Sequence, residues 1–370
     1  MSMEIDDLFL DLSSKCAEPL CWAYGLLRYR VVAPLAPNQF ANYDNTIVEI
    51  AYRCLIVVGA VLAAASIVVP VALILLAVAS KVLRAIGFAL QKNHYTHIRG
   101  LAPEKELQNG VHVMTWNVCG IGGGMPYDHG GVVDWRLRLD PIVEKILAED
   151  PDVLVLQEIY DTALAEALIA RLQEHYAHFF AHLGANVLGS VGGCMVLSKC
   201  AVHRFTNTSF TNNRWTLNRT FATLEVKARP EDSQPCARLI GTHLIHDDNA
   251  ARMVQMNQIV ESLRNAPALP TLLMGDLNLE RDVAEQGGIL TPYFENGYQG
   301  TEPTRTNQML KQWNEDLVDP GDVIDYISLY RAHGPAVSLQ NTHLVRAFDE
   351  TFNTRTALSD HHGLAARLVW

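Results

Sequence analysis

TLLMGDLN, residues 271–278, is the most informative segment of the sequence for predicting the architecture. It starts with a mostly apolar run and ends in Gly275, Asp276 and Asn278. A short apolar run bounded by turn-forming residues is typical of a buried β-strand. The polar side chains then lie at the end of the strand, where a scaffold can present them to a cleft. The stretch therefore predicts a buried strand that ends in functional side chains.

The same pattern recurs on both sides of this stretch. Strand-like runs occupy residues 111–118, 150–159, 194–199, 219–227, 237–245, 323–330 and 364–370. Apolar residues at helical spacing occupy 140–150, 161–176 and 250–265, and Asp161 is a candidate N-cap residue. Several adjacent strands have only turns between them, which favours two packed sheets with helices outside. The pattern predicts an α+β sandwich.

Side chains that bind metal ions or move protons recur where the apolar runs end. They are Asn117, Glu158, His243, Asp276, Asn278 and Asp325, together with SDHHG at 359–363. Carboxylate and amide oxygens suit a hard cation such as Mg²⁺. A histidine paired with a carboxylate suits proton transfer near neutral pH. Each residue alone is more often a turn residue or a structural histidine, so only their joint order predicts a site.

Six motifs resemble, in order and approximate spacing, those of the endonuclease/exonuclease/phosphatase superfamily: TWNV (115–118), DPDVLVLQE (150–158), GTHL (241–244), MGDLN (274–278), IDYI (324–327) and SDHHG (359–363). The resemblance implies a DNase I-like fold, a four-layer α/β/β/α sandwich. It also implies hydrolysis of a phosphoester with Mg²⁺ or Mn²⁺ as cofactor. Asn117 and Glu158 resemble the metal ligands of this superfamily, and Asp360 resembles the acidic neighbour that lines the metal site.

The resemblance implies roles for the other motif residues as well. His361 of SDHHG is similar to the catalytic histidine of the superfamily, and Asp325 of IDYI to the carboxylate that orients it. Asp276 and Asn278 of GDLN resemble the pair that handles the nucleophilic water and the scissile phosphate. His243 of GTHL resembles the second histidine, which contacts the phosphate or the leaving group. Either Asp276 or the histidine–carboxylate pair is the expected activator of the water.

Residues 54–80 contain no charged side chain, and Pro70 interrupts this apolar run. A run of this length is sufficient to cross the hydrocarbon core of a bilayer, which needs roughly 20 helical residues. Two alternatives are a buried core helix and a shallow re-entrant hairpin bent at Pro70. Because the N-terminus is acidic and the apolar run begins far from it, the segment is not a secretory signal peptide. We therefore expect a single membrane span.

The charges that flank this run predict its orientation. Lys81, Arg84 and Lys92 follow the run, whereas only Arg53 lies just before it. The positive-inside rule then places the C-terminal domain on the cytoplasmic side. Residues 81–92 continue as a cationic amphipathic helix suited to the headgroup region. We divide the chain into 1–50, a region of unknown role, 51–92, the membrane anchor, 93–107, a polar linker, and 108–370, the catalytic domain.

Three further segments resemble the sphingomyelinase branch of the superfamily. They are SVGGCMVLSK (190–199), Arg252 with QMNQI (255–259), and the run of residues 304–326. His362 departs from the usual motif, since it adds a second histidine to SDHHG. A lipid headgroup is the substrate that this resemblance implies, and the predicted bilayer anchor would hold the cleft close to it. The chain carries a net charge of −11, which disfavours a polyanionic nucleic acid as partner.

Other functions remain open at this point. A tethered nuclease of the same fold would need a basic or aromatic surface, for which Arg204, Arg214, Trp215 and Arg219 are the candidates. We expect these four residues to be solvated loop residues instead. An inositol-phosphate phosphatase would need a basic cluster that the sequence does not display. A catalytically inactive membrane scaffold is disfavoured, because every expected catalytic residue type is present.

Overall fold

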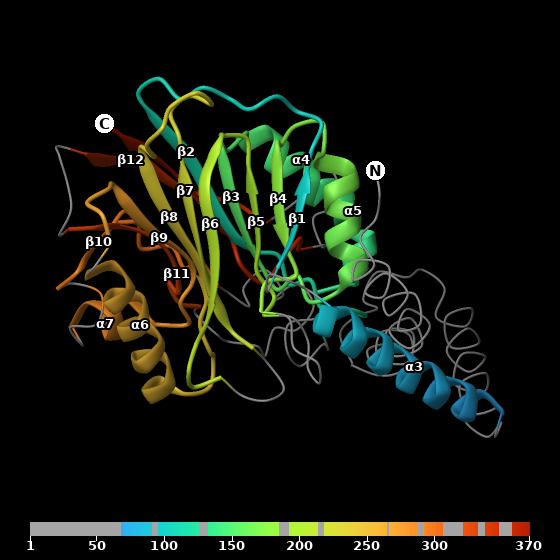
Figure 1. The fold of residues 1–370 in the computed structure, drawn as a ribbon. Coiled ribbons are helices and arrows are strands. Elements are labelled where there is room, and N and C mark those ends of the chain that lie inside the picture. Colours follow the sequence, from blue (N-terminus) through green and yellow to red (C-terminus); the bar gives the residue numbers. More distant parts are fainter. Residues whose placement is uncertain are drawn as a thin grey trace, which may run out of the picture.

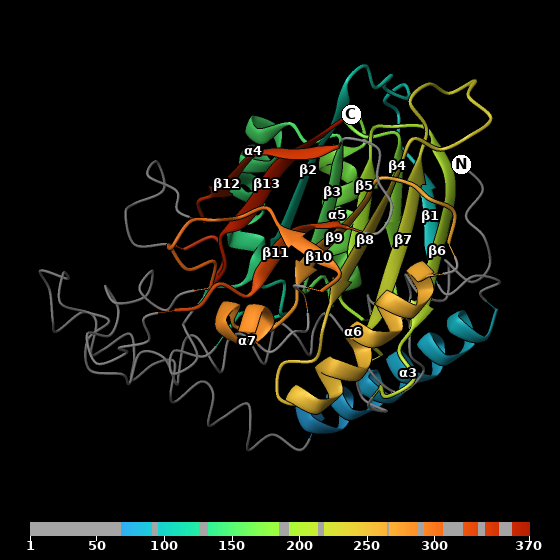
Figure 2. The ribbon, with the colours of Figure 1, turned by 90° about the vertical axis from the view of Figure 1, so that its left-hand side faces the viewer.

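The computed structural model describes residues 68–90, 95–125, 132–184, 192–213, 218–264, 266–286, 290, 292–305, 321–331, 337–347 and 357–370. Within them, two β-sheets pack face to face (Figure 1). Helices α4 (Leu139–Glu149) and α5 (Thr162–Leu172) lie on the outer side of one sheet, and α6 (Asn249–Arg264) and α7 (Arg281–Gln286) on the outer side of the other (Figures 1 and 2). The chain is therefore an α/β/β/α sandwich.

The first sheet has seven strands in the order β1-β4-β5-β3-β2-β13-β12. Their bounds are β1 Thr96–Arg99, β2 Gly110–Asn117, β3 Val153–Gln157, β4 His178–Ala181, β5 Met195–Ser198, β12 Ser338–Val345 and β13 Gly363–Val369. The second sheet has six strands in the order β10-β11-β9-β8-β7-β6. Their bounds are β6 Val202–Ser209, β7 Thr220–Val226, β8 Ala237–His243, β9 Thr271–Asp276, β10 Phe294–Asn296 and β11 Asp325–Tyr330.

Three apolar clusters lie between the four layers. In β3, Leu154 and Leu156 pack into the cluster beneath α4 and α5, whereas Val153 and Val155 join the cluster between the sheets. In β9, Leu273 faces the third cluster, which includes residues of α6. Successive side chains of a strand point to opposite faces, so strands that are covered on both faces need continuous apolar runs. This is why VLVLQ and TLLMG lack polar alternation.

The predicted central elements are confirmed. The runs expected as strands form β2, β3, β5, β7, β8, β9, β11 and β13, and the three expected helices are α4, α5 and α6. Asp161 caps α5, because its side chain accepts a hydrogen bond from the N–H of Ala163 at 3.0 Å. The predicted α+β sandwich is thus the observed architecture.

The sequence patterns missed five strands, namely β1, β4, β6, β10 and β12. One of them, β1, lies in residues 93–107, which the sequence assigns to a linker. It pairs antiparallel with β4 from Thr96 opposite Ala181 to Arg99 opposite His178. Its four residues alternate between half-buried and exposed. A short, polar strand at a sheet edge carries too few apolar residues to be recognised from sequence.

The helix α3 (Val68–Leu90) covers the second part of the predicted membrane run and continues into the predicted cationic helix. The first part of the run, residues 54–67, lies outside the described residues, as do residues 1–50. In the described part of the chain, no helix combines the length and apolar character needed to cross a membrane. The single membrane span therefore stays a prediction.

Candidate active site

The register of three neighbouring strands gathers the first site residues. β8 and β9 are parallel with His243 opposite Asp276, and β9 and β11 are antiparallel with Asp276 opposite Asp325. Residues opposite each other in paired strands have side chains on the same face. His243, Asp276 and Asp325 therefore lie side by side on adjacent strands at one end of the second sheet. All three side chains are buried.

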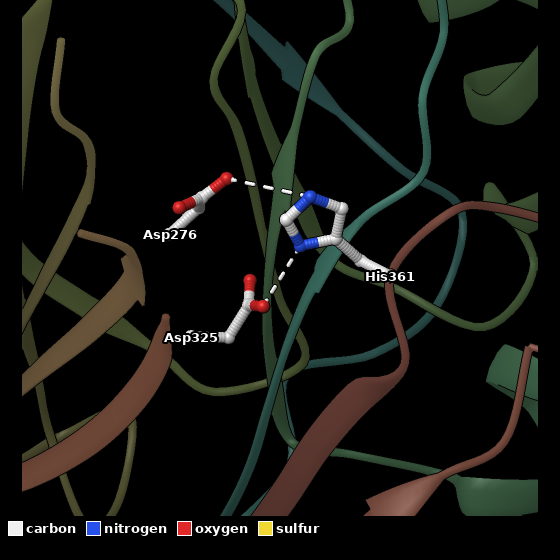
Figure 3. Close-up of side chains that lie close together, drawn as sticks. All are labelled: Asp276, Asp325 and His361. Carbon is white, nitrogen blue, oxygen red and sulfur yellow. Dashed lines mark hydrogen bonds and ion pairs between the residues drawn. The ribbon is translucent and has the colours of Figure 1, made fainter. Parts of the chain in front are cut away.

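His361 approaches this row from the SDHHG segment, just before β13. Its Nδ1 lies 2.8 Å from Oδ2 of Asp325, and its Nε2 lies 3.8 Å from Oδ2 of Asp276 (Figure 3). The first contact is a hydrogen bond, and the second is a longer ion-pair distance. The backbone of His361 is fixed by Trp116, whose indole N–H donates to its carbonyl at 2.9 Å. Ser359 accepts the His361 N–H at 3.1 Å through its hydroxyl.

Asn117, at the end of β2, connects the two sheets at the site. Its side-chain N–H donates to Oδ2 of Asp276 at 3.1 Å, and its Oδ1 accepts the N–H of Cys119 at 3.0 Å. The amide group thus faces the carboxylates with its nitrogen. A role of Asn117 as a metal ligand stays a prediction, because its oxygen is occupied by Cys119 in this arrangement.

Burial and charge shift the pKa values of the two central groups. Burial alone lowers the pKa of His361, but Asp325, Asp360 and Asp276 outweigh it and raise that pKa well above its usual value. Burial and the neighbouring charge of Asp325 raise the pKa of Asp276. His361, Asn117 and the N–H of Asn278 oppose that rise. A histidine and a carboxylate with displaced pKa values in one buried cluster are typical of an active site.

Glu158 follows β3 and has a backbone φ of +64°, which is rare for a residue other than glycine. Burial, followed by the charge of Asp360, raises the pKa of its carboxyl to about 7. Neither Glu158 nor Asp360 forms an ion pair with any described residue. The charges of His361 and Arg219 oppose the rise in the pKa of Glu158 but do not cancel it, so the two carboxylates repel each other in a partly buried site. Oxygen ligands of this kind fit a divalent cation such as Mg²⁺.

A second group of side chains also has ligand-like spacing. One ligand atom from each of Asp276, Asp325 and His361 lies within 4.8 Å of the others. Asp325 already uses one oxygen to hold Nδ1 of His361, and its Oδ1 is buried with no hydrogen-bond partner. The short histidine–carboxylate contact favours a proton-transfer pair here, whereas Glu158 and Asp360 form no ion pair with a described residue. The Glu158 and Asp360 side of the site is therefore the better fit for a cation, and the metal site stays a prediction.

Asn278 lies two residues beyond β9 and has a φ of +51°. Its N–H donates to Oδ1 of Asp276 at 2.9 Å, and its side-chain N–H donates to the carbonyl of Leu244 at 3.0 Å. Asn278 therefore fixes the Asp276 carboxylate and the chain that leaves β8. All eight predicted site residues thus lie at this end of the sandwich, although their individual roles stay predictions.

Arg219, which the sequence assigned to a solvated loop, is buried. Its side chain is 3% exposed, and its guanidinium lies 2.8 Å from Nδ1 of His243. No spacing or composition signal distinguishes it from other arginines. Arg204 is exposed, as expected, but it lies on the edge strand β6 and not in a loop. Arg214 and Trp215 lie outside the described residues.

The structure also explains the second histidine of SDHHG. His362 is 2% exposed, and its Nδ1 accepts the N–H of Ala347 at 3.0 Å. Burial and the charges of Arg346 and His361 lower its pKa to about 4, against the opposing effects of Glu302 and Asp325. His362 is therefore a neutral histidine that supports the chain behind the site.

Comparisons with known proteins agree with this arrangement. A structure of an endonuclease/exonuclease/phosphatase from Bacteroides vulgatus superimposes with a TM-score of 0.55 and 18% identity, covering 70% of this chain and 99% of the other. Sphingomyelinase C from Streptomyces griseocarneus gives a TM-score of 0.52 and 21% identity, covering 70% and 99%. TDP2 from C. elegans gives 0.52 and 19%, covering 72% and 77%. At these identities the likeness establishes the fold.

A search of curated proteins finds no match to this chain. A sequence model of the endonuclease/exonuclease/phosphatase family, in contrast, matches residues 114–361. The matched range begins in β2 and ends at His361, so it contains every residue of the candidate site and most strands of both sheets, whereas β1 and β13 lie outside it. It also confirms the resemblance carried by the six sequence motifs. The chain therefore belongs to the endonuclease/exonuclease/phosphatase family.

Proposed function

We propose that this protein is a membrane-anchored, divalent-metal-dependent phosphodiesterase that hydrolyses a phospholipid headgroup, with sphingomyelin as the first candidate substrate. Members of its family are phosphoester hydrolases, which supports a hydrolase. The observation that carries the proposal is the hydrogen-bonded pair of His361 and Asp325 beside Asp276, near the mutually repelling carboxylates of Glu158 and Asp360. This is the set of groups that water attack on a phosphodiester requires.

The chain's own residues have distinct tasks in this reaction. Asp276 is fixed by Asn117 and by the N–H of Asn278, so its carboxylate can orient a water molecule in line with phosphorus. The water oxygen attacks phosphorus, one proton of the water passes to Asp276, and the ester P–O bond breaks as the leaving oxygen takes up a proton from His361, whose pKa is raised. His243 donates to the phosphoryl oxygens. A divalent ion held by Glu158 and Asp360 would offset the negative charge that develops on phosphorus.

Several observations favour a lipid headgroup over a nucleic acid. The net charge of −11 opposes the approach of a polyanion. Fewer basic residues are left as candidates for nucleic-acid contact, because Arg219 is buried against His243. Three sequence segments resemble the sphingomyelinase branch, and one solved structure with the same fold is a sphingomyelinase C.

The anchor is the second part of the proposal. On α3, Ile74, Val78, Val82, Ile86 and Leu90 are exposed at intervals of four residues, and Leu75 lies beside them. Such a stripe of large apolar side chains is typical of a helix face that is covered in the working protein. We propose that residues 51–92 insert into a bilayer and that the catalytic domain lies on the cytoplasmic side. Carbonate extraction of membranes tests this. The full chain should resist extraction, and a variant that lacks residues 1–94 should not.

The substrate test uses the full chain in detergent or vesicles. Phosphocholine release from sphingomyelin and phosphatidylcholine vesicles is measured with Mg²⁺ and with EDTA, beside nicking of plasmid DNA and phosphate release from inositol phosphates. His361→Ala is the inactive variant. His343→Ala is the matched control, because His343 is an exposed histidine that also pairs with a carboxylate, that of Glu149.

We expect Mg²⁺-dependent phosphocholine release that His361→Ala abolishes and His343→Ala retains. DNA nicking without phosphocholine release would make the protein a tethered nuclease. Release of phosphate from inositol phosphates alone would make it a phosphatase. Absence of all three activities would contradict the hydrolase itself and favour a scaffold.

A further inference from the structure

A buried arginine lies behind the second histidine of the site. One guanidinium nitrogen of Arg219 lies 2.8 Å from Nδ1 of His243 and 3.0 Å from the carbonyl oxygen of Gly192. The side chains of Arg219 and His243 are 3% and 2% exposed. Arg219 forms no ion-pair contact with a described carboxylate, although its charge lowers the pKa of Glu158; its hydrogen-bonded side-chain partner is the imidazole of His243.

The chemistry of this contact fixes the proton on His243. A guanidinium has donors and no acceptor, so Nδ1 of His243 must accept and cannot carry a hydrogen. A neutral histidine in this position then carries its hydrogen on Nε2. Burial, followed by the positive charge of Arg219, lowers the pKa of His243 well below its usual value, which agrees with the neutral form.

The Nε2 side of the ring faces the reacting groups. It lies 3.5 Å from Oδ2 of Asp276, the carboxylate that Asn117 and Asn278 hold in place. His243 therefore presents an N–H donor, and no proton acceptor, to the side of the site where the phosphate is expected. This assigns it a different task from His361.

The local structure keeps Arg219 in this place. Pairing of β7 with β8 sets Phe221 opposite Thr242, so the residues just before β7 lie beside His243. Thr242 strengthens this junction by donating its hydroxyl to the carbonyl of Thr220 at 3.0 Å. The N–H of Arg219 donates to Oδ1 of Asn213 at 2.9 Å. The guanidinium also lies over the ring of Tyr160, 5.8 Å from its centroid.

We propose that Arg219 is a positioning residue that holds His243 as the neutral tautomer with its hydrogen on Nε2, so that His243 serves the reaction as a hydrogen-bond donor to phosphate. This inference rests on the proposed function for its catalytic part. Its structural part, the tautomer, stands independently of any substrate.

The first measurement is NMR of the full chain with ¹⁵N-labelled histidine, with His243→Asn used to assign the signals. In the unaltered protein, Nδ1 of His243 is expected to show the shift of an unprotonated nitrogen and Nε2 that of an N–H. Arg219→Met removes the donor and should yield a mixture of both tautomers. Arg219→Lys keeps a donor and should retain the original tautomer, and Arg204→Met, on an exposed arginine of the same sheet, should change nothing.

The second measurement tests whether Arg219 acts through His243. We expect Arg219→Met to lower kcat about 10- to 100-fold, the range seen when a partner of an active-site histidine is removed. In a His243→Ala background, the same substitution should lower kcat by less than about 3-fold, because coupled residues are non-additive. Arg219→Lys should restore most of kcat. A purely structural role would give equal losses in both backgrounds.

Several outcomes would overturn the inference. An Nδ1–H tautomer in the unaltered protein does so without any variant, so the test survives even if Arg219→Met fails to fold. Equal losses of kcat in both backgrounds would also overturn it. If the tautomer is found and Arg219→Met shifts it, but no phosphoester is hydrolysed, then the proposed function fails while the assignment of Arg219 remains.

Discussion

His361 lies between two carboxylates from neighbouring strands, and the two contacts differ in length. Asp325 holds Nδ1 at 2.8 Å, whereas Asp276 lies 3.8 Å from Nε2. The short contact fixes the ring orientation, and the longer one is not a hydrogen bond, so Nε2 and Asp276 can both contact a reacting group beside them. At the scale of single residues, replacing Asp325 should therefore affect catalysis differently from replacing Asp276.

Replacing Asp325 with asparagine should abolish most activity without unfolding the protein. The substitution is nearly isosteric, but it removes a negative charge that raises the pKa of His361. The pKa of His361 should therefore fall, and kcat should fall roughly 100-fold or more, as expected for loss of acid–base catalysis. Kinetics and a histidine NMR titration measure both effects. Asp282→Asn, on exposed α7, is the control; an unchanged His361 pKa would refute the explanation.

Glu158 supports a prediction about metal and pH. Its folded-state pKa of about 7 exceeds the usual value of 4.5, so between these values the folded state binds a proton that the unfolded state has released. Without metal, stability should therefore fall as pH rises from 4.5 to about 7. Mg²⁺ should raise Tm at pH 7, because it binds the folded state.

The matching variant is Glu158→Gln. It removes the repulsion from Asp360, so Tm in EDTA at pH 7 should rise and its dependence on pH should weaken. Addition of Mg²⁺ should then raise Tm much less than in the unaltered protein. Thermal melts with and without Mg²⁺ across this pH range supply the test. An equal Mg²⁺ response in both proteins would place the cation elsewhere.

At the scale of elements, the segments that carry the site are tied together by one arginine. Arg138, just before α4, donates to the carbonyl oxygens of Val118, Cys119 and Val133, and it also contacts the carbonyl of Leu358. These carbonyls belong to the segment after β2, the segment before the short helix η4 (Trp135–Leu137), and the segment before SDHHG. Arg138 is fully buried.

Arg138→Met should therefore destabilise the protein strongly. It leaves several buried carbonyl oxygens without a donor, at a cost of about 1–3 kcal/mol each. We expect the free energy of unfolding, measured with urea, to fall by at least about 3 kcal/mol. Arg136→Met is the control two residues away: Arg136 pairs with Asp134 near the surface, where such pairs contribute about 1 kcal/mol or less. Similar losses for both variants would contradict this role.

Sequence patterns predict the central elements of the fold better than its edges. β3 and β9 are covered on both faces, so burial requires the apolar runs that identify them. β6 and β12 lie at sheet edges and contain polar, partly exposed residues, so no periodic signal marks them. The candidate site was predictable because its residues follow the central strands. Arg219 was not, because its burial depends on the pairing of β7 with β8.

At the scale of the whole molecule, the edges of the two sheets are joined by aromatic rings. Tyr95 contacts Phe205 of β6 edge-to-face at 4.7 Å between ring centroids and Phe180 of β4 at 6.0 Å. Phe180 and Phe205 also stack on each other. Tyr95 and β1 therefore pack against the two-sheet sandwich, although they precede residue 108, where the sequence places the start of the catalytic domain.

A fragment of residues 95–370 should therefore be more stable than one of residues 108–370. The shorter fragment loses β1 and Tyr95, which exposes the edge of β4 and the rings of Phe180 and Phe205. Losing these contacts should cost at least about 2 kcal/mol. Urea unfolding of both fragments measures the difference. Equal stability would show that β1 contributes nothing to the domain.

The hydrogen bond from Asn117 to Asp276 has a consequence for how the protein loses activity as it unfolds. It is one of the few polar contacts that join the two sheets directly at the site, and its two residues end strands of different sheets. A slip of one sheet over the other by a single residue would separate the two side chains while leaving each sheet intact. Catalytic activity therefore depends on the relative position of the two sheets. During gradual denaturation, activity should be lost as soon as the sheets shift, before the strands within each sheet separate.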